Sequence, residues 1–260
     1  MTPLDVALQA ARSAGNIIMN LRDSVEVSRK SPQELVTQVD LAAQSAIVEQ
    51  IRRHFPDDSV LAEEGMEAPL GSERLWVIDP LDGTHNYIHG VPHYSVSIAR
   101  MHNGVPELGV VYDPCRGEIF TATRGGGAYL DGHRISVSPR PDLHGSFVTA
   151  GFYYDRGQII RDTLDAVERL FVAGIGDIRR TGSAALDLCW VGCGRFDAYV
   201  EYKLCAWDYA AGWLVCTEAG GACSAPYGDP MTLEARGVLA SNGHMHREFV
   251  EVSRRRGIVA

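Results

Sequence analysis

The chain is short of lysine, because only Lys30 and Lys203 among its 24 basic residues are lysines. Acidic residues number 33, so the formal net charge is -9. This balance argues against direct binding to nucleic acid and against attraction to an anionic membrane. It also repels a phosphate dianion, so a phosphate site in this chain would need a cation.

No stretch of the sequence predicts secretion or membrane insertion. The start of the chain, residues 1–5, has no basic segment and no continuous apolar core. No apolar run approaches the length of a membrane span. The six cysteines include no C-x-x-C pair, which gives little support for zinc; free, mostly buried thiols in a reducing cytosol fit better. We therefore expect a cytoplasmic protein.

Several common catalytic motifs are also missing. The sequence contains no G-x-S-x-G elbow and no P-loop, so serine hydrolysis and nucleotide hydrolysis of those types are unsupported. His85, His89 and His93 are spaced four apart, which suggests zinc, but Gly90 and Pro92 interrupt the helix that would align them.

The 260 residues are 45% hydrophobic, enough for one large domain or two small ones. Two helices and then a run of strands with tight turns predict an α+β half over residues 1–138. A boundary is expected near Pro139-Arg140-Pro141, and strands and helices alternate in the second half, residues 139–260. The expected helices are 3–21, 40–54, 160–171, 184–191, 208–219 and one near the C-terminus. The expected strands are 25–27, 60–62, 75–78, 94–100, 107–112, 117–123, 147–149, 196–200 and 238–240, and residues 30–40 are expected to form a loop.

The rest of the chain is organised around residues 79–84, Asp-Pro-Leu-Asp-Gly-Thr. The apolar run Leu75–Ile78 predicts a buried strand that ends at Asp79, where Pro80 should end the sheet. Thr84 should cap the short helical segment that follows. Two carboxylates three residues apart on such a turn can converge, and a cation between them would relieve their repulsion. A capped turn without a metal is the simpler alternative.

Two other stretches favour the metal. Glu63 and Glu64 follow the predicted strand 60–62, and Asp208 opens an apolar helix, where it is most simply an N-cap. Together with the two aspartates of the central turn, Glu63 and Asp208 form an oxygen-only set of ligands. Such a set suits Mg²⁺ or Mn²⁺ rather than zinc.

At this point the sequence resembles a known family, the inositol monophosphatases. Residues 79–87, DPLDGTHNY, and 207–212, WDYAAG, are similar to the two signatures of that family. The resemblance extends over residues 35–221. The segments 111–114, 121–125 and 179–185 look most like the bacterial branch, some members of which also serve transcription antitermination.

The resemblance implies a fold, an activity and a partner. The fold would be one layered αβαβα sandwich of the inositol monophosphatase and fructose-1,6-bisphosphatase type, and the protein would be a homodimer. The activity would be Mg²⁺-dependent, lithium-sensitive hydrolysis of small phosphomonoesters, with inositol 1-phosphate the best single substrate. Another sugar, polyol or histidinol phosphate is the enzymatic alternative. A protein of the transcription machinery with secondary phosphatase activity is the alternative of another class.

The resemblance also implies the ligands of two or three Mg²⁺ ions. Glu63, Asp79 and the Leu81 carbonyl would bind one ion. Asp79, Asp82 and Asp208 would bind the second, and a third, weaker ion would lie by Glu63. Two metals can neutralise a phosphate dianion and activate water.

The remaining roles follow the same resemblance. Thr84 would hold the attacking water while Asp40 polarises its hydroxyl, although Asp40 is equally well explained as a helix cap. The amides of Gly83 and Thr84 would receive phosphate oxygens. Ser183, Ala184, Asp82 and Glu201 complete the substrate side.

Three residues leave open questions. Glu201 is either an acceptor for substrate hydroxyls or a solvated acid that pairs with Lys203. Glu34 stands where the family commonly has Asp, which leaves its role unassigned. His85 replaces a frequent small polar residue and is expected to line the mouth of the site.

Overall fold

The computed structural model describes residues 1–22, 27–29, 35–154 and 157–255. Its helices are α1 (Pro3–Asn20), α2 (Gln38–His54), α3 (Thr84–Ile88), α4 (Gln158–Val172), α5 (Ala184–Gly192), α6 (Ala206–Glu218) and α7 (His246–Ser253). Its strands are β1 (Val27–Arg29), β2 (Leu35–Thr37), β3 (Ser59–Ala62), β4 (Arg74–Asp82), β5 (Ser95–His102), β6 (Val105–Asp113), β7 (Glu118–Thr123), β8 (Gly127–Leu130), β9 (His133–Arg134), β10 (Phe147–Ala150), β11 (Asp177–Arg179), β12 (Ala198–Glu201), β13 (Ala222–Ser224) and β14 (Val238–Ser241).

The larger sheet follows the order of the chain. Its seven strands run β3-β4-β5-β6-β7-β8-β9. The β3–β4 pair is parallel and the later neighbours are antiparallel, joined by short turns. Asn103 and Asp131 adopt positive φ in two of these turns, each followed by glycine, as tight hairpins require.

The smaller sheet has five strands in the order β11-β10-β12-β14-β13. Here β10 pairs in parallel with both of its neighbours, whereas β14 runs antiparallel to β12 and β13. The parallel pairs need crossover connections, which α4 and α5 supply.

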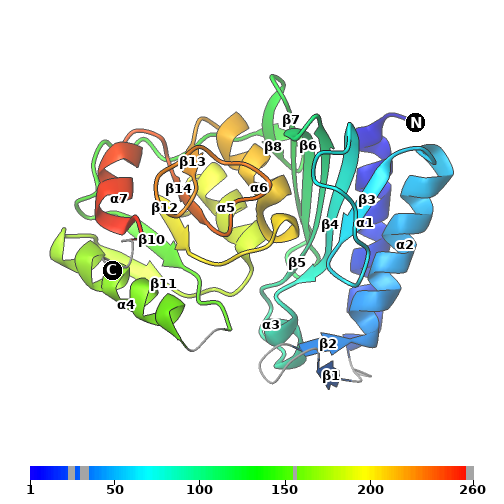
Figure 1. Cartoon of the computed structure of the whole chain (residues 1–260), viewed down its shortest axis with the longest axis horizontal. Coiled ribbons are helices and arrows are strands. Elements are labelled where there is room, and N and C mark those ends of the chain that lie inside the picture. The colour runs from blue at the N-terminus through cyan, green and yellow to red at the C-terminus, as the bar shows by residue number, and fades with distance from the viewer. Residues whose placement is uncertain (23–26, 30–34, 155–156, 256–260) are drawn as a thin grey trace.

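The helices complete a five-layer arrangement, α, β, α, β, α (Figure 1). Helices α1 and α2 cover one face of the larger sheet, and α6 packs on its other face against β5 and β6. Helix α5 pairs with α6 and also reaches β12 and β14. Helices α4 and α7 cover the far side of the smaller sheet. The expected α+β sandwich is confirmed.

Local sequence explains why the first helices start where they do. Thr2 caps α1 and forms a reciprocal capping box with Asp5, and Pro3 occupies the first turn. Thr37 and Asp40 form a second capping box at the start of α2. Thr37 is therefore the N-cap of α2, and Asp40 contributes to the cap from the third helical position rather than as the N-cap itself.

Several local predictions were wrong. Pro80 does not end the sheet, because β4 continues to Asp82 through an irregularity in its pairing with β5 between Asp79 and Asp82. Gly83, in a left-handed conformation, takes the cap position of α3, and Thr84 is the first helical residue. Helix α6 starts two residues before Asp208, which is not its N-cap.

The region 30–40 is not simply a loop, since it contains β2 and the first turn of α2. Glu34 and most of the strand predicted at 25–27 lie outside the described residues, so the question about Glu34 is not addressed. Strands β11 and β13 were not predicted, because three-residue strands carry almost no alternating pattern.

The division into halves at residues 138 and 139 stays a prediction. Helices α5 and α6 come from the second half of the chain yet pack against the larger sheet, so the two halves share the middle layer. Within the described residues, no helix has the length and apolar character needed to cross a membrane. All six cysteines are free thiols; Cys189 and Cys216 are buried and the others are half-buried.

Candidate active site

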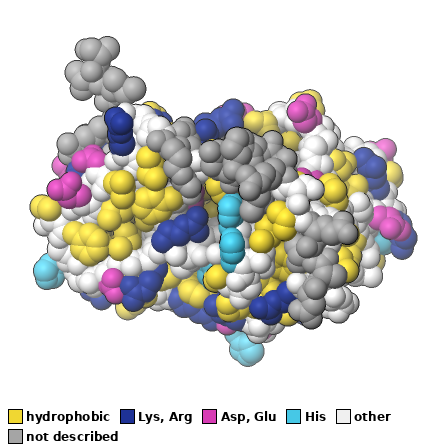
Figure 2. Space-filling model, turned by 90° about the horizontal axis from the view of Figure 1, so that it is seen from below, with side chains coloured by type: hydrophobic (Ala, Val, Ile, Leu, Met, Phe, Trp, Pro, Cys, Tyr) yellow, Lys and Arg dark blue, Asp and Glu magenta, His cyan; other side chains and the backbone are white. Residues whose placement is uncertain are grey.

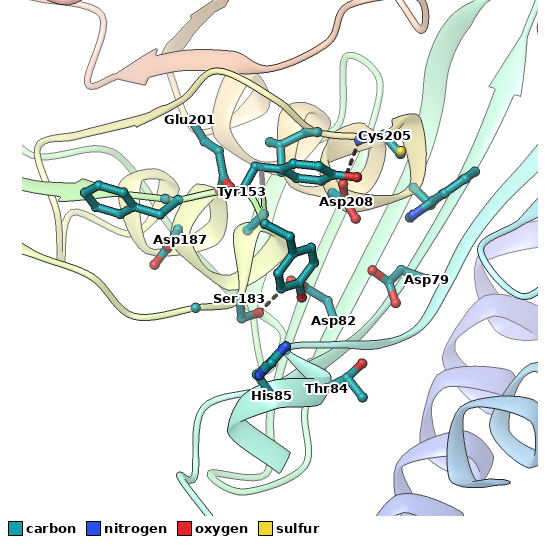
Figure 3. A pocket seen from close by; sticks show the side chains of 18 of the residues that line it. Asp79, Asp82, Thr84, His85, Tyr153, Ser183, Asp187, Glu201, Cys205 and Asp208 are labelled. Carbon is teal, nitrogen blue, oxygen red and sulfur yellow. Dashed lines mark hydrogen bonds between the residues drawn. The ribbon is translucent and has the colours of Figure 1, made fainter. Parts of the chain in front are cut away.

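A pocket that is open to solvent at its mouth brings together segments that are far apart in the sequence. Figure 3 shows acidic side chains pointing into it from β4, β12 and α6. The residues predicted for the site that line this pocket are Glu63, Asp79, Leu81, Asp82, Gly83, Thr84, Ser183, Ala184, Glu201 and Asp208. Asp40 was also predicted for the site, but it does not line the pocket.

The end of β4 presents two of these carboxylates. Asp79 lies before the pairing irregularity and accepts a 3.0 Å hydrogen bond from the backbone N–H of Leu81. Asp82 lies after it, where the strand has rejoined Ser95 of β5. The irregularity therefore lets two acids, three residues apart, reach one pocket.

Helix α5 holds Asp82 in place. The Ser183 hydroxyl donates to Asp82 Oδ2 over 2.6 Å, and the Ala185 N–H donates to the same oxygen over 2.8 Å. Ser183 is also the N-cap of α5. The predicted substrate residue Ser183 therefore contacts Asp82 directly and is fully buried.

Two further acids approach from other elements. Glu63 directly follows β3, and its backbone N–H bonds the Ile78 carbonyl. Asp208 is in the first turn of α6 and accepts a 2.7 Å hydrogen bond from the Cys205 N–H at the helix start. The helix terminus favours a carboxylate there.

Burial and mutual repulsion raise the pKa values of these acids. Burial, then the charges of Glu63, Asp82 and Asp208, raise the pKa of Asp79 well above its ordinary value. Burial and the neighbouring acids do the same to the pKa of Asp208. Burial raises the pKa of Asp82 to about 6, although the bonds from Ser183 and Ala185 oppose it.

Such a cluster fits a divalent cation. Several half-buried or buried carboxylates are costly together unless a cation compensates them, and only oxygen ligands are offered. Within the described residues, however, no three His, Cys, Asp or Glu side chains already stand in a metal-binding arrangement. The donor set fits Mg²⁺, and the side chains would have to close around it.

Thr84 connects this cluster to Asp40. The Thr84 hydroxyl lies 3.1 Å from Asp40 Oδ1 and 3.1 Å from the Leu81 carbonyl oxygen. Asp40 Oδ2 accepts from the backbone N–H and the hydroxyl of Thr37. Burial raises the pKa of Asp40, while the bonds from Thr37 and Thr84 oppose it. Asp40 therefore caps α2 with one oxygen and contacts Thr84 with the other.

Glu201 lies at the opposite side of the pocket, at the end of β12 (Figure 3). The Tyr199 hydroxyl donates to Glu201 Oε2 over 2.6 Å. Burial raises the pKa of Glu201 to about 7. Lys203 places its ammonium group 4.5 Å from the centre of the Tyr153 ring. Glu201 is only 8% exposed, so it is not a solvated surface acid.

Sequence reasoning missed several residues of this pocket. Asp187 of α5 lines it and hydrogen bonds with the Thr181 hydroxyl. Phe152, Tyr153 and Tyr154 follow β10 and form an aromatic wall. The only signal was three consecutive aromatic residues after a predicted strand.

The histidines are not arranged for zinc. His85 lines the pocket, as expected, with its ring 5.2 Å from that of Tyr154. His93 is buried against Trp190, 5.0 Å between ring centres. Helix α3 ends at Ile88, so His89 and His93 lie beyond it.

Comparison with known proteins gives a consistent picture. A family model described as the inositol monophosphatase family matches residues 2–257. The Nus factor SuhB of Pseudomonas aeruginosa is 45% identical over 248 residues, which are 92% of this chain and 91% of that protein. An inositol monophosphatase structure from Anabaena has 39% identity and a TM-score of 0.86, covering 96% of this chain and 94% of that one. The extragenic suppressor protein suhB of Bartonella henselae has 34% identity and a TM-score of 0.90, covering 97% and 98% of the two chains.

Proposed function

We propose that this chain, which belongs to the inositol monophosphatase family, is a Mg²⁺-dependent phosphatase of small phosphomonoesters. The observation that carries the proposal is the convergence of Glu63, Asp79, Asp82 and Asp208 on one pocket beside Thr84. These acids come from the end of β4, from α6 and from the residue that follows β3, and no structural need brings four repelling carboxylates together. A site for cations and phosphate accounts for the arrangement.

The residues that would hold two or three Mg²⁺ ions are Glu63, Asp79, Asp82, Asp208 and the Leu81 carbonyl, and Mn²⁺ suits the same oxygens. Bound there, the ions would neutralise the phosphate dianion and lower the pKa of water. The Leu81 carbonyl has two lone pairs, so its contact with Thr84 leaves one for an ion.

The chain's own residues would position the nucleophile. When the Thr84 hydroxyl donates to Asp40, its oxygen can accept a hydrogen bond from a water molecule in the pocket. Asp40 is fixed in turn by Thr37, so the orientation of the hydroxyl is set before substrate binds. Glu63, at the edge of the same cluster, would accept a proton from that water.

Substrate would lie between this cluster and Glu201. The backbone N–H groups of Gly83, Thr84 and Ala184 would receive phosphate oxygens, and Ser183 would act on substrate through its bond to Asp82. Glu201, held by Tyr199, would accept hydroxyls of a polyol. With phosphate-binding groups at one end of the pocket and a hydroxyl acceptor at the other, we expect inositol 1-phosphate to be the preferred substrate, ahead of other sugar, polyol or histidinol phosphates.

The proposal is tested by phosphate release from a panel of phosphomonoesters, with Mg²⁺, with Mn²⁺ and with EDTA. We expect metal-dependent turnover that is inhibited by Li⁺. The Thr84→Val variant keeps the shape but loses the hydroxyl, so it should turn over at least a hundredfold more slowly. Absence of turnover on every phosphomonoester with either metal would refute the proposal.

A second candidate function has a specific observation behind it. The P. aeruginosa relative is named a Nus factor, which suggests a protein partner in the transcription machinery. The net charge of -9 argues that such a partner would be protein rather than nucleic acid. Co-elution of the purified chain with RNA polymerase from its source organism tests this idea, and the Thr84→Val variant shows whether catalysis is needed.

We further propose that the protein is a cytoplasmic homodimer that uses the outer face of α4. Leu164, Phe171 and Val172 are 54%, 50% and 83% exposed. Figure 2 shows hydrophobic side chains gathered on the part of the surface where α4 lies. A second copy of the chain would bury this patch. The free cysteines support a reducing compartment.

A further inference from the structure

Arg180 has an unusual position in the candidate active site. Among the described residues that line the pocket, it is the one lysine or arginine. It follows β11 and is exposed at the pocket surface. The acids that line the same pocket are Glu63, Asp79, Asp82, Asp187, Glu201 and Asp208.

Despite these acids, Arg180 forms no ion pair and no hydrogen bond within the part of the chain that the structure describes. Its charge still acts at longer range, because it opposes the burial that raises the pKa values of Asp82, Asp187 and Glu201. The guanidinium is therefore close enough to face the pocket and far enough from each acid to keep its hydrogen-bond donors available.

The neighbouring residue Arg179 behaves differently. Its guanidinium pairs with Asp177 over 2.6 Å and lies 4.9 Å from the centre of the Phe147 ring. Arg179 does not line the pocket. The two adjacent arginines therefore have separate surroundings, and only Arg180 offers its charge to a ligand.

Gly182 sets the place of the Arg180 guanidinium. A Cβ atom on Gly182 would come within 2.1 Å of Arg180 Nη1, so the guanidinium lies against the glycine backbone. Gly182 directly precedes Ser183, whose hydroxyl binds Asp82. Its carbonyl oxygen is also 3.1 Å from where a Cβ on Gly83 would stand. Arg180 therefore lies beside the end of the pocket that holds the proposed phosphate-binding amides.

We propose that Arg180 binds a second anionic group of the substrate, in addition to the phosphate that is hydrolysed. This second group is a carboxylate or a phosphate. The proposal rests on the proposed phosphatase function. A guanidinium presents a planar fork of donors that matches both anions. Because the other charged residues that line the pocket are acidic, Arg180 would favour substrates that carry a second negative charge. A substrate with one phosphate and only hydroxyls elsewhere would make no such contact with the guanidinium.

The test compares Arg180→Gln with the matched control Arg179→Gln on two substrate pairs. Glycerol 3-phosphate and 3-phosphoglycerate differ by a carboxylate, and fructose 1-phosphate and fructose 1,6-bisphosphate differ by a phosphate. The measurement is the ratio of kcat/KM for the doubly charged substrate to that for its partner. A charge-assisted contact predicts that Arg180→Gln lowers this ratio roughly ten- to a hundredfold in at least one pair. The pair that responds identifies the anion.

The control variant should leave both ratios at the wild-type value. If Arg180 only moderates the acidic charge, Arg180→Gln changes all four substrates alike and shifts the Mg²⁺ concentration for half-maximal rate, which overturns the proposal. Wild-type enzyme that hydrolyses the monophosphates but neither doubly charged substrate also overturns it. Wild-type enzyme inactive on all four substrates and on inositol 1-phosphate instead refutes the phosphatase function.

Discussion

Gly151 is the position at which a single methyl group tests the role of Glu201. A Cβ at Gly151 would stand 1.7 Å from Glu201 Oε2 and 2.2 Å from its Cδ. The backbone cannot easily withdraw, because the Gly151 N–H bonds the Val200 carbonyl over 2.9 Å. Gly151→Ala must therefore push the Glu201 carboxylate out of its place beside Tyr199.

The size of the effect follows from what the carboxylate loses. A hydrogen bond to a charged acceptor contributes about 1.5–3 kcal/mol, so losing the contact with a substrate hydroxyl should lower kcat/KM roughly ten- to 150-fold. The lost bond from Tyr199 should also destabilise the fold by about 1–3 kcal/mol, or roughly 2–4 °C in Tm for each kcal/mol. The residues proposed as metal ligands are not touched.

The assay is the ratio of kcat/KM for inositol 1-phosphate to kcat/KM for 2-glycerophosphate, which has no ring hydroxyls. Gly151→Ala and Glu201→Ala should lower this ratio equally. The double variant should lower it no further, because Gly151→Ala acts only through Glu201. An unchanged ratio in Gly151→Ala, with the protein folded, would show that Glu201 does not contact the ring and would remove the main support for inositol.

Three further predictions concern the metal, the pH and the assembly. Asp79→Asn should slow turnover on the order of a thousandfold or more at saturating Mg²⁺ while thermal unfolding stays cooperative, and near-wild-type turnover would mean that the ligand assignment is wrong. Burial, helped by the charges of Arg116 and Arg180, lowers the pKa of His93 to about 4. The unfolded state takes up a proton near pH 6.5 and the folded state does not, so stability should fall by up to about 3 kcal/mol between pH 6.5 and 4. The raised pKa values of Asp82 and Glu201 act in the opposite direction over this range, so the quantity to measure is the difference between wild type and His93→Gln in the free energy of urea unfolding, in EDTA, at each pH. This difference should show the slope, and a difference that does not change with pH would refute the assignment. Leu164→Glu with Phe171→Glu should give a monomer by light scattering, and a dimer that persists would place the interface elsewhere.

The carboxylates that we propose as metal ligands could be selected from the sequence because each one stands at a local signal. Asp79 ends an apolar run, Glu63 follows another, and Asp208 lies at the start of an apolar helix. In a layered α+β fold, the ends of neighbouring strands and the starts of the helices packed on them can lie at the same edge of the sheet. Their convergence on one pocket agrees with that reasoning, although the exact places of Pro80 and Asp208 in their elements were wrong.

Other parts of the site carried no such signal. Arg180 follows β11, which pairs with β10, and a strand of three residues leaves no pattern to read. Asp187 lies in α5, an almost wholly buried helix in which no amphipathic pattern shows the side that faces the pocket. The hydrogen bond from Tyr199 to Glu201 joins residues on one face of β12, but nothing in the sequence shows which face is turned to the pocket. A strand that is buried on both faces has apolar residues at successive positions, so its sequence does not show which side chains point toward the pocket.

Asp82 explains why the two sheets act as one site. One of its oxygens, Oδ2, is held by the Ser183 hydroxyl and the Ala185 N–H at the start of α5. Its backbone belongs to β4 of the larger sheet, whereas α5 also packs on β12, which carries Glu201. This carboxylate therefore links the proposed metal end to the proposed substrate end, in addition to the packing of α5 and α6 between the two sheets. A shift of α5 would change the position of a proposed metal ligand, so residues that hold α5 in place should influence metal affinity as well as substrate choice.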